Sequence, residues 1–230
     1  MASDSAVSVE PSELSSSVVV FDFDGTLVSR DSFLDFVFGY CARRPGRLLL
    51  VFALLPLALP LALRSWQRAA SLLLWGITLG TSTRSFVRAL RRYALDTLPG
   101  YANDAIFIEL AAQLDAGHRV VIATGSMPLL VRGLLSARKL APLPIVGSRL
   151  RRRWGGFVTE THCIGKTKVR ELRHRLGICE WSTVYTDSFA DRSLLRGARY
   201  ITLVSPSGRT LRRTQRLIDD ATELRVLRRL

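Results

Sequence analysis

Two carboxylates stand close together near the start of the chain, at the end of a short apolar segment. Asp22 and Asp24 fall in the run FDFDGT. In an extended strand, residues two apart project from the same face, so both carboxyl groups would point the same way. Such a pair is repulsive unless a cation or a shared proton compensates it. Mg²⁺ suits this arrangement, because it prefers oxygen ligands and also binds phosphate oxygens.

Hydroxyl and amino groups follow later segments. Thr124 ends the apolar run RVVIAT, and Gly125 follows it in ATGSMP. A hydroxyl and the N–H groups of a following helix together can seat a phosphate, although an ordinary capped helix explains part of this pattern. Lys166 and Lys168 open a helical segment, where a cation opposes the helix dipole. We therefore expect one of the two lysines to serve the site.

A second acidic run, YTDSFAD, follows another apolar segment. Asp187 stands at the end of that segment and is the expected metal ligand, with Ser188 beside it as a supporting residue. Asp191 lies four positions later, so a turn or helix start would bring it to the same face. Asp191 would orient the lysine or a metal-bound water, or cap the helix.

The elements that must position these groups alternate along the chain. Helical patterns at 104–116, 127–140 and 166–176 separate short apolar segments, which read as strands at 17–23, 119–124, 143–146, 183–186 and 198–204. This alternation predicts an α/β fold with a parallel sheet covered by helices on both faces. Parallel sheets carry their chemistry at the carboxyl ends of the strands. Gly155 and Gly156 predict a hairpin.

Residues 30–117 separate the first two strands and are too long for an ordinary crossover, so they predict a helical cap. Within the cap, residues 48–63 are apolar at all 16 positions and include Pro56 and Pro60. A helix of this length spans about 24 Å, against about 30 Å for a hydrocarbon core. We interpret residues 45–80 as a membrane-associating hairpin, re-entrant or interfacial, with Trp66 and Trp75 as interfacial anchors. The alternative is a helical pair buried inside the cap.

The charge distribution points to an anionic partner. The chain carries 33 Lys+Arg and 19 Asp+Glu, for a net charge of +14, and its 48% hydrophobic content excludes a disordered protein. From Phe36 to Leu95 there is no acidic residue, yet nine arginines lie there. Residues 83–95 have the pattern of a basic amphipathic helix, on which Arg84 and Arg88 are candidate substrate contacts.

Four segments of the chain together resemble the haloacid dehalogenase superfamily, in its phosphoserine-phosphatase-like subclass. FDFDGT, Thr124, CIGKTKVREL and DSFAD correspond to its four motifs, in order. The resemblance implies a Rossmannoid core, residues 17–29 and 118–208, with a C1-type cap at 30–117. It implies Asp22 as nucleophile and Asp24 as general acid and base. It further implies phosphate binding by Thr124, Gly125 and Lys168, and Mg²⁺ held by Asp22, Asp187 and the backbone carbonyl of Asp24.

Residues 18–195 are more closely similar to bacterial phosphatases of the phosphatidylglycerophosphatase C type, through SLLLWGITLG, ATGSMPLLV and RRRWGGFVTETHCIGKTKV. That resemblance implies an anionic phospholipid substrate at the inner membrane, with the catalytic core on the cytoplasmic side. Asp31 would face the substrate or cap a helix. Residues 1–16, expected to form a flexible leader, and residues 209–230, expected to form a basic amphipathic helix, fall outside the resemblance.

Two other functions remain open. One is a soluble phosphatase of the same subclass that acts on a small phosphomonoester such as a phosphoserine-like metabolite. The other is a nucleic-acid-binding protein that uses Arg151–Arg153 with Trp154 and the arginines of the tail, Arg212, Arg213, Arg216, Arg228 and Arg229. No recognised nucleic-acid motif accompanies those residues, so no nucleic-acid partner is expected. The sequence leaves the oligomeric state open.

Overall fold

The protein is built on a six-stranded sheet in which every pair of neighbouring strands is parallel. The computed structural model describes residues 17–228. In spatial order the strands are β3 (Ile145–Val146), β2 (Arg119–Ala123), β1 (Val18–Phe21), β6 (Thr183–Thr186), β7 (Tyr200–Val204) and β8 (Glu223–Leu227). The predicted α/β fold with a parallel sheet is confirmed.

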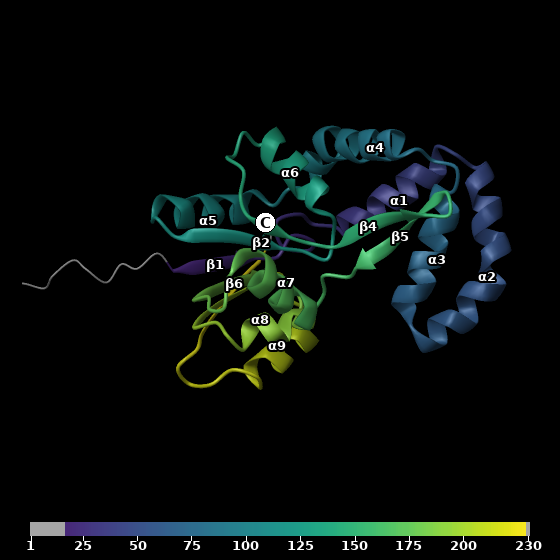
Figure 1. Ribbon diagram of the computed structural model, residues 1–230. Coiled ribbons are helices and arrows are strands. Elements are labelled where there is room, and N and C mark those ends of the chain that lie inside the picture. Colours follow the sequence, from purple (N-terminus) through teal and green to yellow (C-terminus); the bar gives the residue numbers. More distant parts are fainter. Residues whose placement is uncertain (1–16, 229–230) are drawn as a thin grey trace, which may run out of the picture.

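The central strand β1 buries both of its faces, because its residues are apolar at every position. Val19 and Phe21 pack into one hydrophobic cluster, whereas Val20 packs into a second cluster on the opposite face. Five helices cover the two faces (Figure 1): α5 (Asp104–Asp115) and α6 (Pro128–Ala137) on one, and α7 (Lys166–Leu176), α8 (Arg192–Leu195) and α9 (Gly208–Gln215) on the other.

The insertion between β1 and β2 forms a helical cap. Its elements are α1 (Ser32–Ala42), α2 (Gly46–Arg64), α3 (Trp66–Thr78), α4 (Thr83–Asp96) and a 3-10 turn, η1 (Leu98–Tyr101). The helix α5 follows the cap but packs on β2 of the core. The cap predicted over residues 30–117 therefore includes one helix that belongs to the core. Val28, after β1, pairs with Ala102, before α5, so the cap leaves and re-enters the core at the same edge of the sheet.

The helices α2 and α3 form a hairpin at the end of the molecule away from the sheet (Figure 1). Pro56 and Pro60 lie inside α2 without breaking it. Ala58 is buried on the inner face of α2. Leu54 packs closely on Gly76 of α3, because a Cβ added at Gly76 would lie 2.4 Å from Cδ1 of Leu54. The two helices therefore touch along one side only.

The opposite side of α2 is exposed. Among residues 17–228, α2 is the one helix long and apolar enough to cross a membrane, and 6% of its most apolar stretch is buried. The alternative of a pair buried inside the cap is therefore wrong for α2. Trp66 is 73% exposed at the turn between the helices. Trp75 is half-buried, and its indole N–H donates to the backbone of Arg153 and Trp154; its role as an interfacial anchor stays a prediction.

The predicted hairpin forms a separate two-stranded sheet. Its strands are β4 (Arg149–Arg153) and β5 (Gly156–Thr161), antiparallel and joined by a two-residue turn at Trp154 and Gly155. β5 packs on α3 of the cap: Thr78 accepts the N–H of Phe157, and Ser71 accepts the N–H of Thr159. The β4–β5 hairpin, which belongs to the core part of the chain, therefore packs against the cap.

The single helix expected over 209–230 is wrong. α9 ends at Gln215, and a turn at Asp219–Thr222 redirects the chain into β8, which pairs with β7 at the sheet edge. Leu224 and Leu227 pack against the two faces of the sheet, and this burial favours a strand. Residues 229 and 230, like the leader expected at 1–16, lie outside the described residues.

The close approach of α4 and α6 gives a prediction on stability. A Cβ at Gly133 of α6 would lie 2.4 Å from the Cβ of Ala94 on α4. Overpacking costs about 1–3 kcal/mol, whereas alanine gains about 0.5–1 kcal/mol over glycine in a helix interior. We expect Gly133→Ala to lower the free energy of unfolding in urea by roughly 1 kcal/mol.

The matched control is Gly39→Ala in α1, where no atom lies within 4 Å of the added Cβ. It should leave the free energy of unfolding unchanged or raise it. Equal effects of the two substitutions would contradict the close packing of α4 on α6.

Candidate active site

Three neighbouring strands deliver their terminal polar residues to one edge of the sheet. Asp22 follows β1, Thr124 follows β2 and Asp187 follows β6, and these strands lie in the order β2, β1, β6. Because the strands are parallel, their carboxyl ends meet at the same edge. The sheet thus brings together three of the residues that the sequence singled out.

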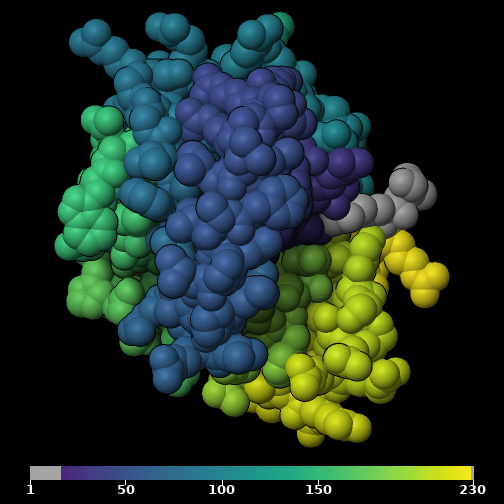
Figure 2. Space-filling model, turned by 90° about the vertical axis from the view of Figure 1, so that its right-hand side faces the viewer, coloured from purple at the N-terminus to yellow at the C-terminus, as the bar shows by residue number. Residues whose placement is uncertain are grey.

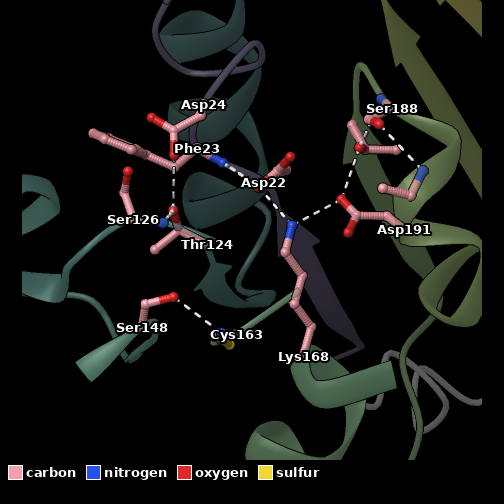
Figure 3. Close-up of polar contacts among 12 residues, drawn as sticks. Asp22, Phe23, Asp24, Thr124, Ser126, Ser148, Cys163, Lys168, Ser188 and Asp191 are labelled. Atoms are coloured by element: carbon pink, nitrogen blue, oxygen red, sulfur yellow. Dashed lines mark hydrogen bonds and ion pairs between the residues drawn. The ribbon is translucent and has the colours of Figure 1, made fainter. Parts of the chain in front are cut away.

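At the centre of this edge, Lys168 lies between two carboxylates (Figure 3). Its Nζ donates to Oδ1 of Asp22 at 2.7 Å and to Oδ2 of Asp191 at 2.8 Å, and all three side chains are buried. Thr186 also donates to Asp191, at 2.9 Å. Lys166 is exposed, so the lysine of the site is Lys168. The Asp191 side chain does not cap α8; it orients the lysine.

Burial and charge oppose one another in this triad. Burial raises the pKa of Asp22 well above its usual value, the Lys168 ammonium opposes the rise, and Asp191 adds to it. Burial lowers the pKa of Lys168, but the two carboxylates together outweigh that effect and hold the pKa above its usual value. Lys168 therefore stays charged, and its charge limits the rise in the pKa of Asp22.

The Asp24 carboxyl group accepts one hydrogen bond from the cap and one from the core. Its Oδ1 accepts the backbone N–H of Ser32 at 2.8 Å, at the start of α1, and its Oδ2 accepts from Thr124 Oγ1 at 3.4 Å. Burial raises the pKa of Asp24, and hydrogen bonds from Ser126 and Ser32 partly offset that rise. A carboxyl group with a raised pKa holds a proton more readily than an exposed aspartate does.

Two serines that the sequence analysis did not assign to the site join these parts. Ser32 Oγ and Ser126 Oγ are 2.8 Å apart and buried, although 94 positions separate them. The Ser126 side chain does not cap α6, and its backbone N–H instead donates to Thr124 Oγ1 at 2.8 Å. The run of hydroxyl residues after β2 was the available signal for Ser126. For Ser32 the sequence offers none.

Asp187 lies directly against the turn after β1. Gly25 has φ +79°, and a Cβ added there would stand 2.2 Å from Oδ2 of Asp187. Glycine is therefore required at this position, both for its backbone conformation and for the close approach of the carboxylate.

The residues at this edge fit the expected magnesium site. Within residues 17–228 no three His, Cys, Asp or Glu side chains form a preassembled metal cluster. The expected ligands include only two side-chain carboxylates, from Asp22 and Asp187, with the Asp24 carbonyl as a third. Mg²⁺ usually keeps several waters and binds through one or two carboxylates together with substrate phosphate. The donor set present is of that kind.

The remaining predicted site residues have local or peripheral positions. Asp31 caps α1 by accepting the N–H of Leu34 at 2.9 Å, and Ser188 accepts the N–H of Ala190 at 3.1 Å. Arg84 and Arg88 lie on the exposed face of α4, opposite the buried side that packs inside the cap. Gly125 adjoins Ile164 in the loop before α7. Whether Asp31, Arg84 or Arg88 contacts a substrate stays a prediction.

A cavity of about 560 Å³ lies away from these groups, between α5 and strands β6 to β8. Its polar side chains already pair with each other: Tyr185 donates to Glu109 at 3.1 Å, and Arg225 forms an ion pair with Glu109 at 3.0 Å. None of the residues that line it belongs to the Asp22 edge. The candidate site is therefore the carboxyl edge of the sheet.

Comparison with known proteins identifies a family and a fold. Residues 19–196 match the family of haloacid dehalogenase-like hydrolases. Among solved structures, a protein of unknown function from Bordetella pertussis Tohama I is similar with a TM-score of 0.68 and 17% identity, over 91% of this chain and 98% of that one. A phosphoserine phosphohydrolase-like protein from Francisella tularensis gives 0.61 and 14%, over 93% and 95%. A phosphoserine phosphatase in its apo form gives 0.56 and 14%, over 91% and 92%. These structural similarities show the fold.

The buried triad gives a prediction on stability. Lys168→Met removes the cation and leaves Asp22 and Asp191 buried together, and breaking a buried ion pair from one side costs about 3–5 kcal/mol. We expect a loss of this size at pH 7, measured by urea unfolding with a chelator present. Carboxyl groups whose folded-state pKa is raised destabilise the fold above their unfolded pKa. The loss should therefore shrink as the pH falls through the raised values toward about 4.

Lys166→Met, two positions away and exposed, is the control and should change the free energy of unfolding by less than about 0.5 kcal/mol. A deficit for Lys168→Met that stays constant between pH 7 and pH 4 would contradict the role assigned to the lysine.

Proposed function

This chain belongs to the haloacid dehalogenase-like hydrolase family, and we propose that it is a magnesium-dependent phosphatase that converts phosphatidylglycerophosphate to phosphatidylglycerol and phosphate. The observation that carries the phosphatase proposal is the position of Lys168 between Asp22 and Asp191, at the strand edge where Asp24 is also held. Each group needed to transfer a phosphoryl group to an aspartate and then to water is present there.

In the first step an Asp22 carboxylate oxygen attacks phosphorus, and the bond from phosphorus to the ester oxygen breaks. Both hydrogen bonds that Asp22 accepts, from Phe23 N–H and Lys168, go to Oδ1, so Oδ2 is the attacking atom. The departing alkoxide takes a proton from Asp24. An aspartyl phosphate on Asp22 results, which divides one difficult hydrolysis into two easier steps.

In the second step water attacks the same phosphorus and gives a proton to Asp24, and the bond from phosphorus to Asp22 breaks. Asp24 must hold a proton in the first step and accept one in the second. Its raised pKa favours the protonated form, and its contacts with Ser32 and Thr124 fix its position through both steps.

The phosphoryl oxygens are placed by Thr124, the Gly125 backbone and Lys168. The ammonium is already fixed by two carboxylates, so it stabilises developing charge without reorganising. Asp22, Asp187 and the Asp24 carbonyl would hold Mg²⁺, which when bound offsets the negative charge shared by nucleophile and phosphate. The protein mainly positions and neutralises.

The lipid substrate is supported by the exposed side of α2. Four residues on this side, spaced as on one helical face, form what we call the apolar stripe, and they are between 63% and 91% exposed: Leu49, Phe52, Leu59 and Leu63. A continuous exposed apolar surface of this kind marks an interaction site, and a bilayer is the partner we propose. Because a two-chain phospholipid stays in the bilayer, the enzyme must reach it there, on the cytoplasmic face of the inner membrane.

The nucleophile assignment is tested by Asp22→Asn. An amide is a poor nucleophile for phosphorus, so phosphate release should fall by about 10³-fold or more for any accepted ester, with the fold retained by circular dichroism. Asp115→Asn, on the exposed end of α5, is the control with the same chemical change and should keep full activity. Substantial turnover by the Asp22 variant would remove Asp22 from the mechanism.

Disruption of the apolar stripe tests the lipid substrate. We expect Leu49→Gln, Leu59→Gln and Leu63→Gln together to lower kcat/KM for phosphatidylglycerophosphate in vesicles by roughly tenfold or more, because each removes buried apolar contact with the bilayer. Hydrolysis of a soluble aryl phosphate should not change. A control pair on other surfaces, Leu95→Gln and Ile108→Gln, should leave both activities intact.

A phosphate-release assay also distinguishes a lipid phosphatase from a soluble phosphatase. Phosphate release should be measured from anionic phospholipid monoesters and from soluble esters, including phosphoserine. Faster turnover of a soluble metabolite, with no effect of the stripe variants on any substrate, would identify a soluble phosphatase and contradict the lipid assignment.

A further inference from the structure

The turn of the β4–β5 hairpin carries an aromatic residue in a costly conformation. Trp154 and Gly155 occupy the two central positions of the turn, both with positive φ, +46° and +79°. This turn favours Asn or Gly at its first central position, and a bulky residue there is an outlier. The Trp154 side chain is nevertheless 77% exposed, so it gains little from packing. The turn therefore holds a bulky residue in a strained backbone conformation and leaves its indole ring exposed.

Three arginines precede the indole. Arg151, Arg152 and Arg153 are all exposed, and within residues 17–228 none of the three forms an ion pair with an acidic residue. The Arg153 guanidinium lies 4.5 Å from the centre of the Trp154 ring. We call residues 151–154 the hairpin tip. It combines three uncompensated positive charges with an exposed aromatic ring, which fits a partner that is both anionic and partly apolar.

The backbone of the tip is fixed to the cap. The Trp75 indole N–H donates to the carbonyl oxygens of Arg153 and Trp154, at 3.1 and 3.3 Å. Gly80 donates its N–H to the carbonyl oxygen of Gly155 at 2.9 Å. Trp75 belongs to α3, which packs along α2, so the hairpin tip and the apolar stripe are parts of one packed unit.

The tip and the stripe also lie at the same end of the molecule. In Figure 1 the β4–β5 hairpin extends from the sheet toward α2 and α3. Figure 2 views that end directly, with α2 across the middle and the green hairpin beside the cap helices. A flat surface that contacts α2 would therefore also lie close to the hairpin tip.

We propose that the hairpin tip, Arg151–Trp154, is a second point of contact with an anionic bilayer, beside the apolar stripe of α2. The proposal rests on the lipid substrate proposed above. Tryptophan is favoured at the interface between headgroups and acyl chains, and arginines are attracted to anionic headgroups. The tip adds three positive charges to those of Arg43, Arg64 and Arg68, which are exposed near the ends of α2, so it strengthens the dependence of binding on anionic lipid.

The hairpin also links this contact to the site. It leaves the core after Ser148 and returns at Cys163, where Ser148 Oγ accepts the Cys163 N–H at 3.0 Å, five residues before Lys168. Contact at the tip would hold the active-site edge at a fixed distance from the bilayer. Loss of the contact should raise KM for a substrate in vesicles and leave kcat for a soluble ester unchanged.

The test compares two triple variants of the full chain that remove the same charge. One is Arg151→Gln, Arg152→Gln and Arg153→Gln at the tip. The control is Arg209→Gln, Arg212→Gln and Arg213→Gln on α9, whose arginines are also exposed. Binding is measured by co-sedimentation with phosphatidylcholine vesicles that contain or lack phosphatidylglycerol. The tip variant should bind the anionic vesicles roughly tenfold to a hundredfold more weakly, and the control should change by less than about threefold.

A second variant, Trp154→Asn, separates a contact from a folding role. Asparagine suits the left-handed turn, so the variant should unfold at an equal or higher temperature than the parent chain. It should still bind vesicles several-fold more weakly. Unchanged vesicle binding by the folded Trp154→Asn variant would overturn the role assigned to Trp154.

Other outcomes decide between this inference and the function on which it rests. Equal weakening by the two triple variants would show that only net charge matters and would overturn the inference. Unchanged vesicle binding by the tip variant, with binding lost in the apolar-stripe variant, would overturn it and leave the proposed function standing. Loss of binding to duplex DNA or RNA, with vesicle binding intact, would assign the tip to nucleic acid. No hydrolysis of any phosphate ester by the parent chain would defeat the proposed function itself.

Discussion

The site depends on one buried cation between two carboxylates. Without Lys168, Asp22 and Asp191 would be buried like charges, and one of them would take up a proton. In the proposed mechanism Asp22 must be ionised to attack phosphorus, so the lysine would support the chemistry as well as the structure. The three residues come from the end of β1, the first turn of α7 and the turn after β6. Only the parallel sheet, which places these segments at one edge, brings them within hydrogen-bonding distance.

Much of this arrangement could be predicted from the sequence, because it follows from local patterns. Buried strands such as β1 and β6 are short apolar runs that end in acidic residues, and parallel pairing then fixes where those acids lie. The contact between Ser32 and Ser126 could not be predicted, since nothing local marks two hydroxyls 94 positions apart. The strand β8 was missed for a different reason. An edge strand is half exposed, and Leu217, Leu224 and Leu227 fit a helical period equally well.

The prolines of α2 show how tertiary context overrides a local rule. Pro56 and Pro60 predict a break, because each lacks an N–H and crowds the preceding turn. The helix continues because Leu54 and Ala58 are packed on its inner side, against α3, whereas both prolines fall on the same helical face as the apolar stripe. Carbonyl groups left without a helical partner then lie on the outer side of α2, away from the packed interior.

The packing of α2 also determines how it would meet a bilayer. The helix is already formed and held by α3, and the hairpin tip is fixed to α3 through Trp75. A segment that folded only on contact would lose ordering entropy from its binding free energy, whereas a preformed surface does not. Modest contributions from a few leucines, arginines and one indole can therefore add up to useful affinity. A rigid unit that binds at two points also fixes orientation, and a soluble headgroup analogue would gain nothing from it. Under the proposed function, the free-energy cost of the exposed apolar surface of the cap would be compensated where α2 contacts a membrane.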